Sequence, residues 1–100
     1  MDELKKYLYD IEHLCSQYKV NKLYAFGSVL TDRFNKNSDI DFIVDFQPLD
    51  ILQYADNYYN LKFSLENILH RPVDLLEEKA IKNPYFLQVV NSKKKLVYEY

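Results

Sequence analysis

The sequence predicts an α/β (α+β) fold in which helices pack on one β-sheet. Two observations predict it: helix-like and strand-like segments alternate along the whole chain, and the spacing of the apolar residues changes from one segment to the next. Apolar residues three or four positions apart indicate an amphipathic helix, whereas strict alternation indicates a strand with one buried face. An alternation of such segments calls for a sheet with helices packed against it.

The first half of the chain is expected to hold one helix and two strands. Residues 2–18 have the helical spacing, and the apolar run 23–26 is typical of a buried strand that ends at Gly27. A helical turn over 28–31 and a polar loop come next. The clearest strand spans 39–46, where one face carries Ile40, Phe42, Val44 and Phe46 and the other carries Asp39, Asp41, Ile43 and Asp45.

The second half is expected to begin with a long helix over 51–69. Asp50 and Gln53, three residues apart, resemble a capping box at its start, and Arg71-Pro72 ends it because the residue before proline avoids the helical region. The remaining elements are a strand over 73–76, a short helix opened by Asn83-Pro84, and a terminal edge strand over 96–98.

Composition indicates one domain over residues 1–100 in the cytoplasm. Nearly half of the residues are apolar, which is enough for a core, and the net charge of −2 argues against a broad nucleic-acid surface. The only basic run, Lys93-Lys94-Lys95, is interpreted as a solvated loop end. The lone Cys15 excludes a disulfide framework within the chain. No apolar signal region and no membrane span of roughly 20 apolar residues is evident.

Gly27 is the only glycine, although glycine normally makes up about 7% of a sequence. It stands between an apolar strand and Ser28. A glycine lets the backbone approach a phosphate group without a Cβ in between, and Ser28 adds a hydroxyl and a backbone N–H. A Gly-Ser pair after a strand is also common in ordinary turns, so its meaning depends on the residues beyond it.

Carboxylates come after this turn. Asp39 and Asp41 lie two residues apart on a strand, so both side chains point to one face, about 6.6 Å apart along the chain. Such a pair can bind Mg²⁺, which prefers oxygen ligands, although charges on a solvent-facing edge strand are an alternative. A third carboxylate would hold a metal near an acceptor hydroxyl and help it lose its proton. Asp74, inside an apolar run, is the candidate, with Glu77 and Glu78 as rivals.

The combination of Gly27-Ser28, ten further residues, Asp39-Ile40-Asp41 and a later Asp74 resembles the nucleotidyltransferase superfamily of DNA polymerase β. The short chain resembles its minimal (MNT-type) members. The resemblance implies a mixed, mostly antiparallel sheet flanked by helices, ATP as the nucleotide donor and two Mg²⁺ ions. It carries over Gly27 and Ser28 as the phosphate-contacting turn, and Asp39, Asp41 and Asp74 as the catalytic metal ligands.

The segment after the Gly-Ser pair departs from the pattern of many relatives, in which a small residue, an arginine and a glycine come next. Here Arg33 lies later and there is no second glycine. Arg33 is therefore the candidate to bind the nucleotide phosphates, with Lys36 as a further cation that could reach the triphosphate.

Many minimal members are antitoxins paired with a helical ribonuclease toxin of the HEPN type, which they inactivate by adding AMP to a tyrosine. The resemblance thus implies Mg-dependent transfer of AMP from ATP to an acceptor hydroxyl, on a tyrosine of such a toxin within a hetero-oligomer. Two alternatives stay open. One is a non-catalytic antitoxin that masks its toxin by contact. The other is an enzyme that modifies a small molecule such as an antibiotic, which would need an additional substrate-binding domain.

Overall fold

The computed structural model describes residues 2–100, which form a four-stranded sheet in the order β3-β2-β1-β4. The strands are β1 (Val20–Phe26), β2 (Ile40–Phe46), β3 (Val73–Glu77) and β4 (Lys95–Glu99). The helices are α1 (Asp2–Lys5), α2 (Leu8–Gln17), α3 (Ile51–Leu69) and α4 (Pro84–Lys93), with short 3₁₀ helices η1 (Gly27–Leu30) and η2 (Glu78–Ala80).

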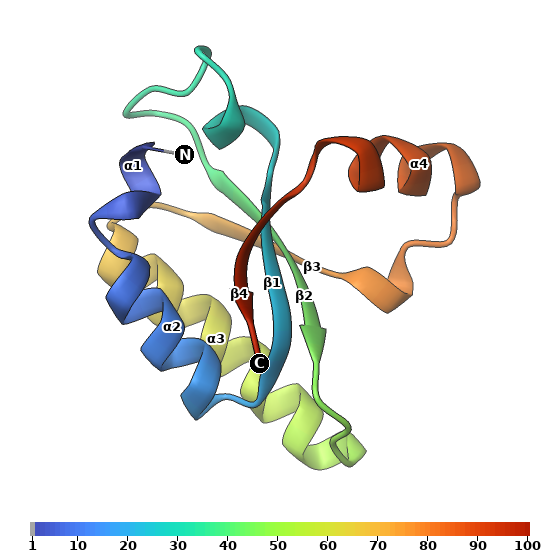
Figure 1. The fold of residues 1–100 in the computed structure, drawn as a ribbon. Helices are drawn as coiled ribbons and strands as arrows, with labels where there is room; N and C mark the ends of the chain where they lie inside the picture. Colours follow the sequence, from blue (N-terminus) through green and yellow to red (C-terminus); the bar gives the residue numbers. More distant parts are fainter. Residues whose placement is uncertain (1) are drawn as a thin grey trace.

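The sheet is mixed and mostly antiparallel, as predicted. β1 is antiparallel to both β2 and β4, whereas β2 and β3 run parallel. A parallel pair needs a long crossover connection, which the 19-residue helix α3 supplies. The sheet, α2 and α3 appear as two layers in Figure 1, with α4 on the other side of the sheet.

The first helix differs from its prediction. Instead of one helix over 2–18, the chain turns at Lys6–Tyr7, where the Tyr7 N–H donates to the Leu4 carbonyl oxygen at 3.0 Å. Leu4 before the turn and Ile11 after it are both fully buried in the same core. The apolar spacing therefore continues across the break, and the pattern alone does not reveal it.

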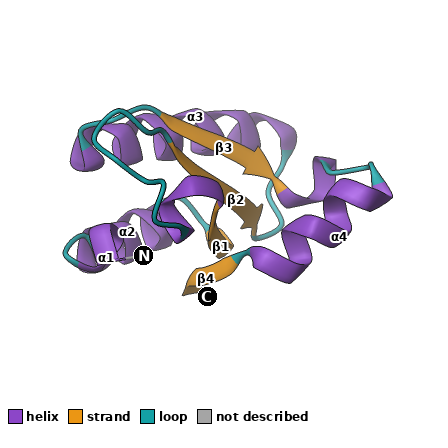
Figure 2. Ribbon diagram, turned by 90° about the horizontal axis from the view of Figure 1, so that it is seen from above, coloured by secondary structure: helices purple, strands orange, loops and turns teal. Residues whose placement is uncertain are grey.

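β2 alternates as predicted, except at Ile43. Phe42 and Val44 are fully buried in the core beneath α2 and α3. Ile43 points to the opposite face with the acidic residues, yet it is fully buried too. Helix α4 lies on that side of the sheet (Figure 2), and its Val90 is also fully buried. The second face of the sheet is thus partly covered.

The predicted helix starts are confirmed by their caps. The Asp50 carboxylate accepts a hydrogen bond from the Gln53 N–H at 2.9 Å, and the Asn83 side chain accepts from the first N–H groups of α4. β1 begins at Val20 rather than at residue 23, because Val20 pairs with Phe46 across the sheet. β4 is an edge strand, as expected. Over residues 2–100, none of the helices has the length and apolarity to cross a membrane.

Candidate active site

The predicted turn at Gly27 directly contacts a predicted carboxylate. Gly27 has a φ of +79°, a region that other residues rarely adopt. A Cβ added at this position would overlap Oδ2 of Asp41. The contact arises from strand pairing, because Phe26 at the end of β1 is the register partner of Asp41 on β2. Position 27 must therefore be glycine for two reasons, its backbone angle and the space taken by Asp41.

Asp74 lies next to Asp41, on β3, the strand that pairs with the other edge of β2. The two residues are register partners in the parallel β2–β3 pair, so their side chains leave adjacent strands on the same face. Their carboxyl groups lie close enough to hydrogen-bond. Asp41 is half-buried and Asp74 is exposed. The two strands on which these carboxylates were predicted are therefore neighbours in the sheet.

Asp39 lies just before β2 and is exposed. It is two residues from Asp41 and acts on it electrostatically. Burial, the charge and hydrogen bonding of Asp74, and then the charge of Asp39 together raise the pKa of Asp41 to about 6. Each of these charges disfavours the ionised form of Asp41, because like charges repel at short range. A bound cation would relieve this repulsion.

The donor set fits Mg²⁺. Within residues 2–100, no three His, Cys, Asp or Glu side chains are arranged to hold a metal ion by themselves. Mg²⁺ does not need such a cage, since it is usually held by one or two carboxylates together with substrate phosphates and water. The Asp41–Asp74 pair, with Asp39 beside it, offers oxygen ligands of this kind and carries unbalanced negative charge.

The rival carboxylates lie elsewhere. Glu77 is the register partner of Val44, three positions further along β2 than Asp41, and it lies beside Tyr54, whose pKa is raised by burial and then by Glu77. Glu78 forms an ion pair with Lys94 at 3.0 Å. Of the three candidates for the third carboxylate, Asp74 is the one that the strand register places next to Asp41.

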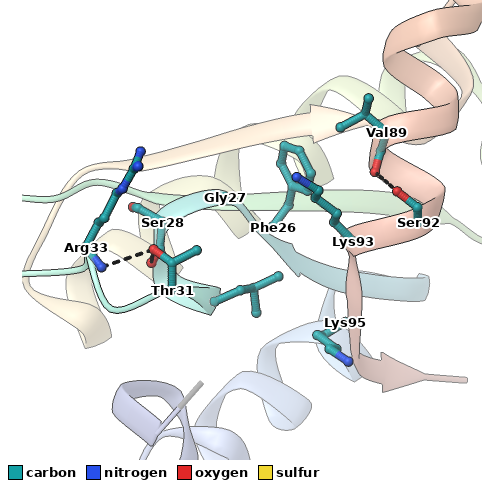
Figure 3. Close-up of a pocket in the computed structure, with 10 residues that line it drawn as sticks. Phe26, Gly27, Ser28, Thr31, Arg33, Val89, Ser92, Lys93 and Lys95 are labelled. Atoms are coloured by element: carbon teal, nitrogen blue, oxygen red, sulfur yellow. Dashed lines mark hydrogen bonds between the residues drawn. The ribbon is translucent and has the colours of Figure 1, made fainter.

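A cleft of about 620 Å³ is lined by Gly27, the residue that contacts Asp41, and by residues of the following turn (Figure 3). One wall is the turn after β1, with Gly27, Ser28 and Arg33, all three of which were predicted to contact phosphate. Thr31 fixes this wall: its hydroxyl donates to the Ser28 carbonyl oxygen at 2.9 Å and accepts from the Arg33 N–H at 3.2 Å. The shifted Arg33 is thus held in the same cleft as the Gly-Ser pair. Lys36 is exposed and is not one of the lining residues.

The opposite wall was not foreseen. It is formed by the last turn of α4 and the start of β4, with the lining residues Val89, Ser92, Lys93 and Lys95. The interpretation of Lys93-Lys94-Lys95 as a solvated loop end holds for the exposed Lys93 and Lys95, but Lys94 is only partly exposed, and the run is the short junction between α4 and β4. The sequence did mark these lysines as its only basic run. Their position opposite Gly27 could not be predicted, because it depends on the pairing of β4 with β1.

The comparison with protein families decides the identity. A family model described as "Polymerase beta, Nucleotidyltransferase" matches residues 9–100. The chain belongs to this nucleotidyltransferase family. The family resemblance of the sequence motif is therefore confirmed, and the protein is a nucleotidyltransferase.

Individual relatives agree with this assignment. The nucleotidyltransferase is 38% identical to a Methanocaldococcus jannaschii protein named "Putative protein adenylyltransferase MJ1379" over 72 residues, which are 72% of this chain and 71% of that protein. A solved "putative minimal nucleotidyltransferase" has a TM-score of 0.73 and 25% identity, and the match covers 94% of this chain and 92% of that one. A crystal structure of a toxin-antitoxin with AMP-PNP has a TM-score of 0.71 and 25% identity, covering 93% of this chain and 73% of that one.

Proposed function

We propose that this nucleotidyltransferase transfers AMP from ATP to a hydroxyl group of a partner protein, with Mg²⁺ bound by Asp39, Asp41 and Asp74. One observation carries the proposal: the Asp41–Asp74 pair touches the Gly27 turn at the edge of a cleft lined by cations. This arrangement offers carboxylates for metal ions next to cations for phosphates. We infer that residues 1–100 act as one minimal domain in the cytoplasm.

Different residues would bind the phosphates and the metal ions. Gly27 and Ser28 bring backbone to the phosphates without an intervening side chain, and Arg33 supplies positive charge from the same wall. The carboxylates of Asp39, Asp41 and Asp74 would hold the metal ions that bind the nucleotide phosphates. Two bound Mg²⁺ ions would lower the pKa of the acceptor hydroxyl and neutralise charge on the transferred and leaving groups.

The reaction is an in-line displacement. The acceptor oxygen forms a bond to the α-phosphorus, and the bond from this phosphorus to the bridging oxygen of the β-phosphate breaks, releasing pyrophosphate. The hydroxyl proton passes to the Asp74 carboxylate and from there to solvent, since Asp74 is exposed. Positioning and charge stabilisation supply most of the catalysis in reactions of this type.

The exposure of the carboxylates favours a protein acceptor. Asp39 and Asp74 are both exposed, so a hydroxyl on another macromolecule can reach them from solvent. The similarity to a solved toxin-antitoxin supports a toxin as this partner. The family resemblance points further, to a tyrosine of a helical HEPN-type toxin held with this chain in a hetero-oligomer. The name of the Methanocaldococcus relative supports adenylyl transfer to protein.

Labelled ATP tests the proposal. The purified protein is incubated with Mg²⁺, ATP labelled at the α-phosphate, and a HEPN-type toxin as the candidate acceptor. We expect label on the toxin, and we expect Asp41→Ala to abolish it. Asp45→Ala is the matched control: it removes an aspartate from the same strand and face, but Asp45 binds Asn21 at 2.8 Å and Lys79 at 3.6 Å instead of Asp74.

Three results would overturn the proposal. Equal labelling by wild type and Asp41→Ala would remove the carboxylate pair from the reaction. Toxin neutralisation that survives alanine at Asp39, Asp41 and Asp74 together, with no label transferred by wild type, would show the non-catalytic antitoxin. Label transferred to an aminoglycoside and not to the toxin would show the small-molecule enzyme.

A further inference from the structure

Three consecutive lysines at the α4–β4 junction have two different environments. The Lys94 ammonium forms an ion pair with Glu78 at 3.0 Å and lies 4.1 Å from the centre of the Tyr24 ring. Its two neighbours, Lys93 and Lys95, line the cleft opposite Gly27. The division arises from the backbone: Lys94 is extended, with φ −64° and ψ 149°, so successive side chains point to opposite sides.

Lys94 therefore acts as an anchor for its neighbours. Its side chain is only partly exposed, and its two contacts hold the junction against β1 and η2. Lys93 and Lys95 are exposed, and the ion pairs found over residues 2–100 include neither of them. Two lysines thus line the cleft without carboxylate partners in these ion pairs.

The positive charge of the residues that line the cleft favours an anionic ligand. Arg33 lines one wall and Lys93 and Lys95 line the other, and no aspartate or glutamate is among the lining residues. This local charge contrasts with the net charge of −2 for the whole chain. Three cations around about 620 Å³ suit a compact polyanion. Lysine suits the terminal phosphates of a nucleotide, because its ammonium is a compact charge on a flexible stem that can reach a phosphate in several positions.

We propose that Lys93 and Lys95 bind the β- and γ-phosphates of the nucleotide from the side opposite Gly27 and Ser28. The α4–β4 junction thereby makes this chain select nucleoside triphosphates over nucleotides with fewer phosphates. The inference rests on the proposed function, because it assigns the cleft to the donor nucleotide. It adds a second wall to the phosphate site, which the Gly-Ser turn does not supply.

Calorimetric binding of two probes in the presence of Mg²⁺ tests this assignment. The probes are AMP-PNP, an ATP analogue with an imido group between its β- and γ-phosphates, and inorganic tripolyphosphate, which lacks the nucleoside. Lys93→Ala and Lys95→Ala are each expected to lower the affinity for both probes about tenfold. This is the loss of one charge-assisted contact of about 1.4 kcal/mol. Lys82→Ala is the matched control, because Lys82 is an exposed lysine just before α4 and outside the cleft.

The outcomes separate the assignment from its alternatives. A variant that carries both Lys93→Ala and Lys95→Ala is measured as well. If it binds both probes as tightly as wild type, the assignment of the lysines to the phosphates is wrong. Weaker binding of AMP-PNP alone would assign the lysines to the nucleoside end and would overturn it too. Because no acceptor is present, the binding result stands whether or not wild type later transfers AMP. A wild type that binds both probes but labels no partner would refute the proposed function and leave the phosphate site intact.

Discussion

The carboxylate of Asp41 occupies the space next to Gly27 that a Cβ at position 27 would need. Gly27 and Asp41 are fourteen residues apart in the sequence, but β1 and β2 pair so that Phe26 and Asp41 are partners. The phosphate-binding turn and the metal-binding strand of the proposed site are therefore in direct contact. A change at one is expected to move the other.

Gly27→Ala tests this contact. The substitution places a side chain in a left-handed conformation, which costs about 1 kcal/mol of unfolding free energy, and pushes the Asp41 carboxylate away. We expect transfer activity to fall at least a hundredfold while urea unfolding shows only the small loss of stability. Measured activity near that of wild type would mean that Asp41 tolerates displacement and that the contact is unimportant.

The raised pKa of Asp41 predicts that the protein loses stability as the pH rises through 6. This pKa is about 6 in the folded protein, against an ordinary value of 3.8, so the folded state holds the proton more tightly than the unfolded chain does. The resulting stabilisation is complete below pH 3.8 and is lost as the pH passes 6. Because Asp41 is only half-buried, solvent screening limits the effect to about 1 kcal/mol.

Urea unfolding at pH 4 and pH 7 in a chelating buffer measures this effect. The free energy of unfolding of wild type should fall between these pH values by about 1 kcal/mol more than that of Asp41→Asn, which cannot ionise. Comparing the two proteins cancels the titration of the other carboxylates. Identical pH dependence of the two proteins would show that Asp41 ionises freely.

Divalent cations should offset the repulsion among the carboxylates and thereby stabilise the folded protein. At pH 7.5, Mg²⁺ that binds the folded state alone raises the free energy of unfolding by roughly 1.5 kcal/mol at about ten times its dissociation constant. We expect this rise in wild type, and we expect it to vanish in Asp41→Asn and in Asp74→Asn. Thermal unfolding with Mg²⁺ and with the same ionic strength of Na⁺ separates specific binding from screening. An equal response to both salts would argue against a metal site.

Arg71 holds the loop between the two halves of the site. Its guanidinium donates to the carbonyl oxygens of Asn35 at 3.0 Å and Ser38 at 2.8 Å, and its carbon lies 4.5 Å from the centre of the Phe34 ring. Arg71 precedes β3, which carries Asp74. The side chain thus fastens the loop that leads into Asp39 and β2 to the start of the neighbouring strand.

Arg71→Lys separates the geometry of this fastening from its charge. Lysine keeps the charge but loses the planar fork and the stacking, so we expect a loss of about 1–2 kcal/mol in unfolding free energy and faster amide hydrogen exchange over residues 35–38. Arg33→Lys is the control, since Arg33 lies in the cleft and its side chain does not fasten the loop. Unchanged exchange in Arg71→Lys would show that the loop holds its shape without the guanidinium.

The sequence predicts the individual helices and strands better than it predicts how they are arranged in the fold. The caps at Asp50 and Asn83 and the alternation of β2 could be predicted because each depends on residues close together in the chain. The turn at Lys6–Tyr7 could not, since the core favours the same apolar spacing with or without a break. The burial of Ile43 could not be predicted either, since it lies on the face of the sheet where α4, a distant segment of the chain, also lies.

By itself, the sequence determined the kinds of groups that this protein brings to chemistry: a turn that tolerates only glycine, carboxylates at a strand-like spacing and a lone basic run. The tertiary structure decided which of them meet. The register of β2 with β3 selected Asp74 over Glu77 and Glu78, and the pairing of β4 with β1 placed Lys93 and Lys95 across from Gly27. The physical reason is that local backbone preferences act over a few residues, whereas strand register is set by burying one shared core across the whole chain.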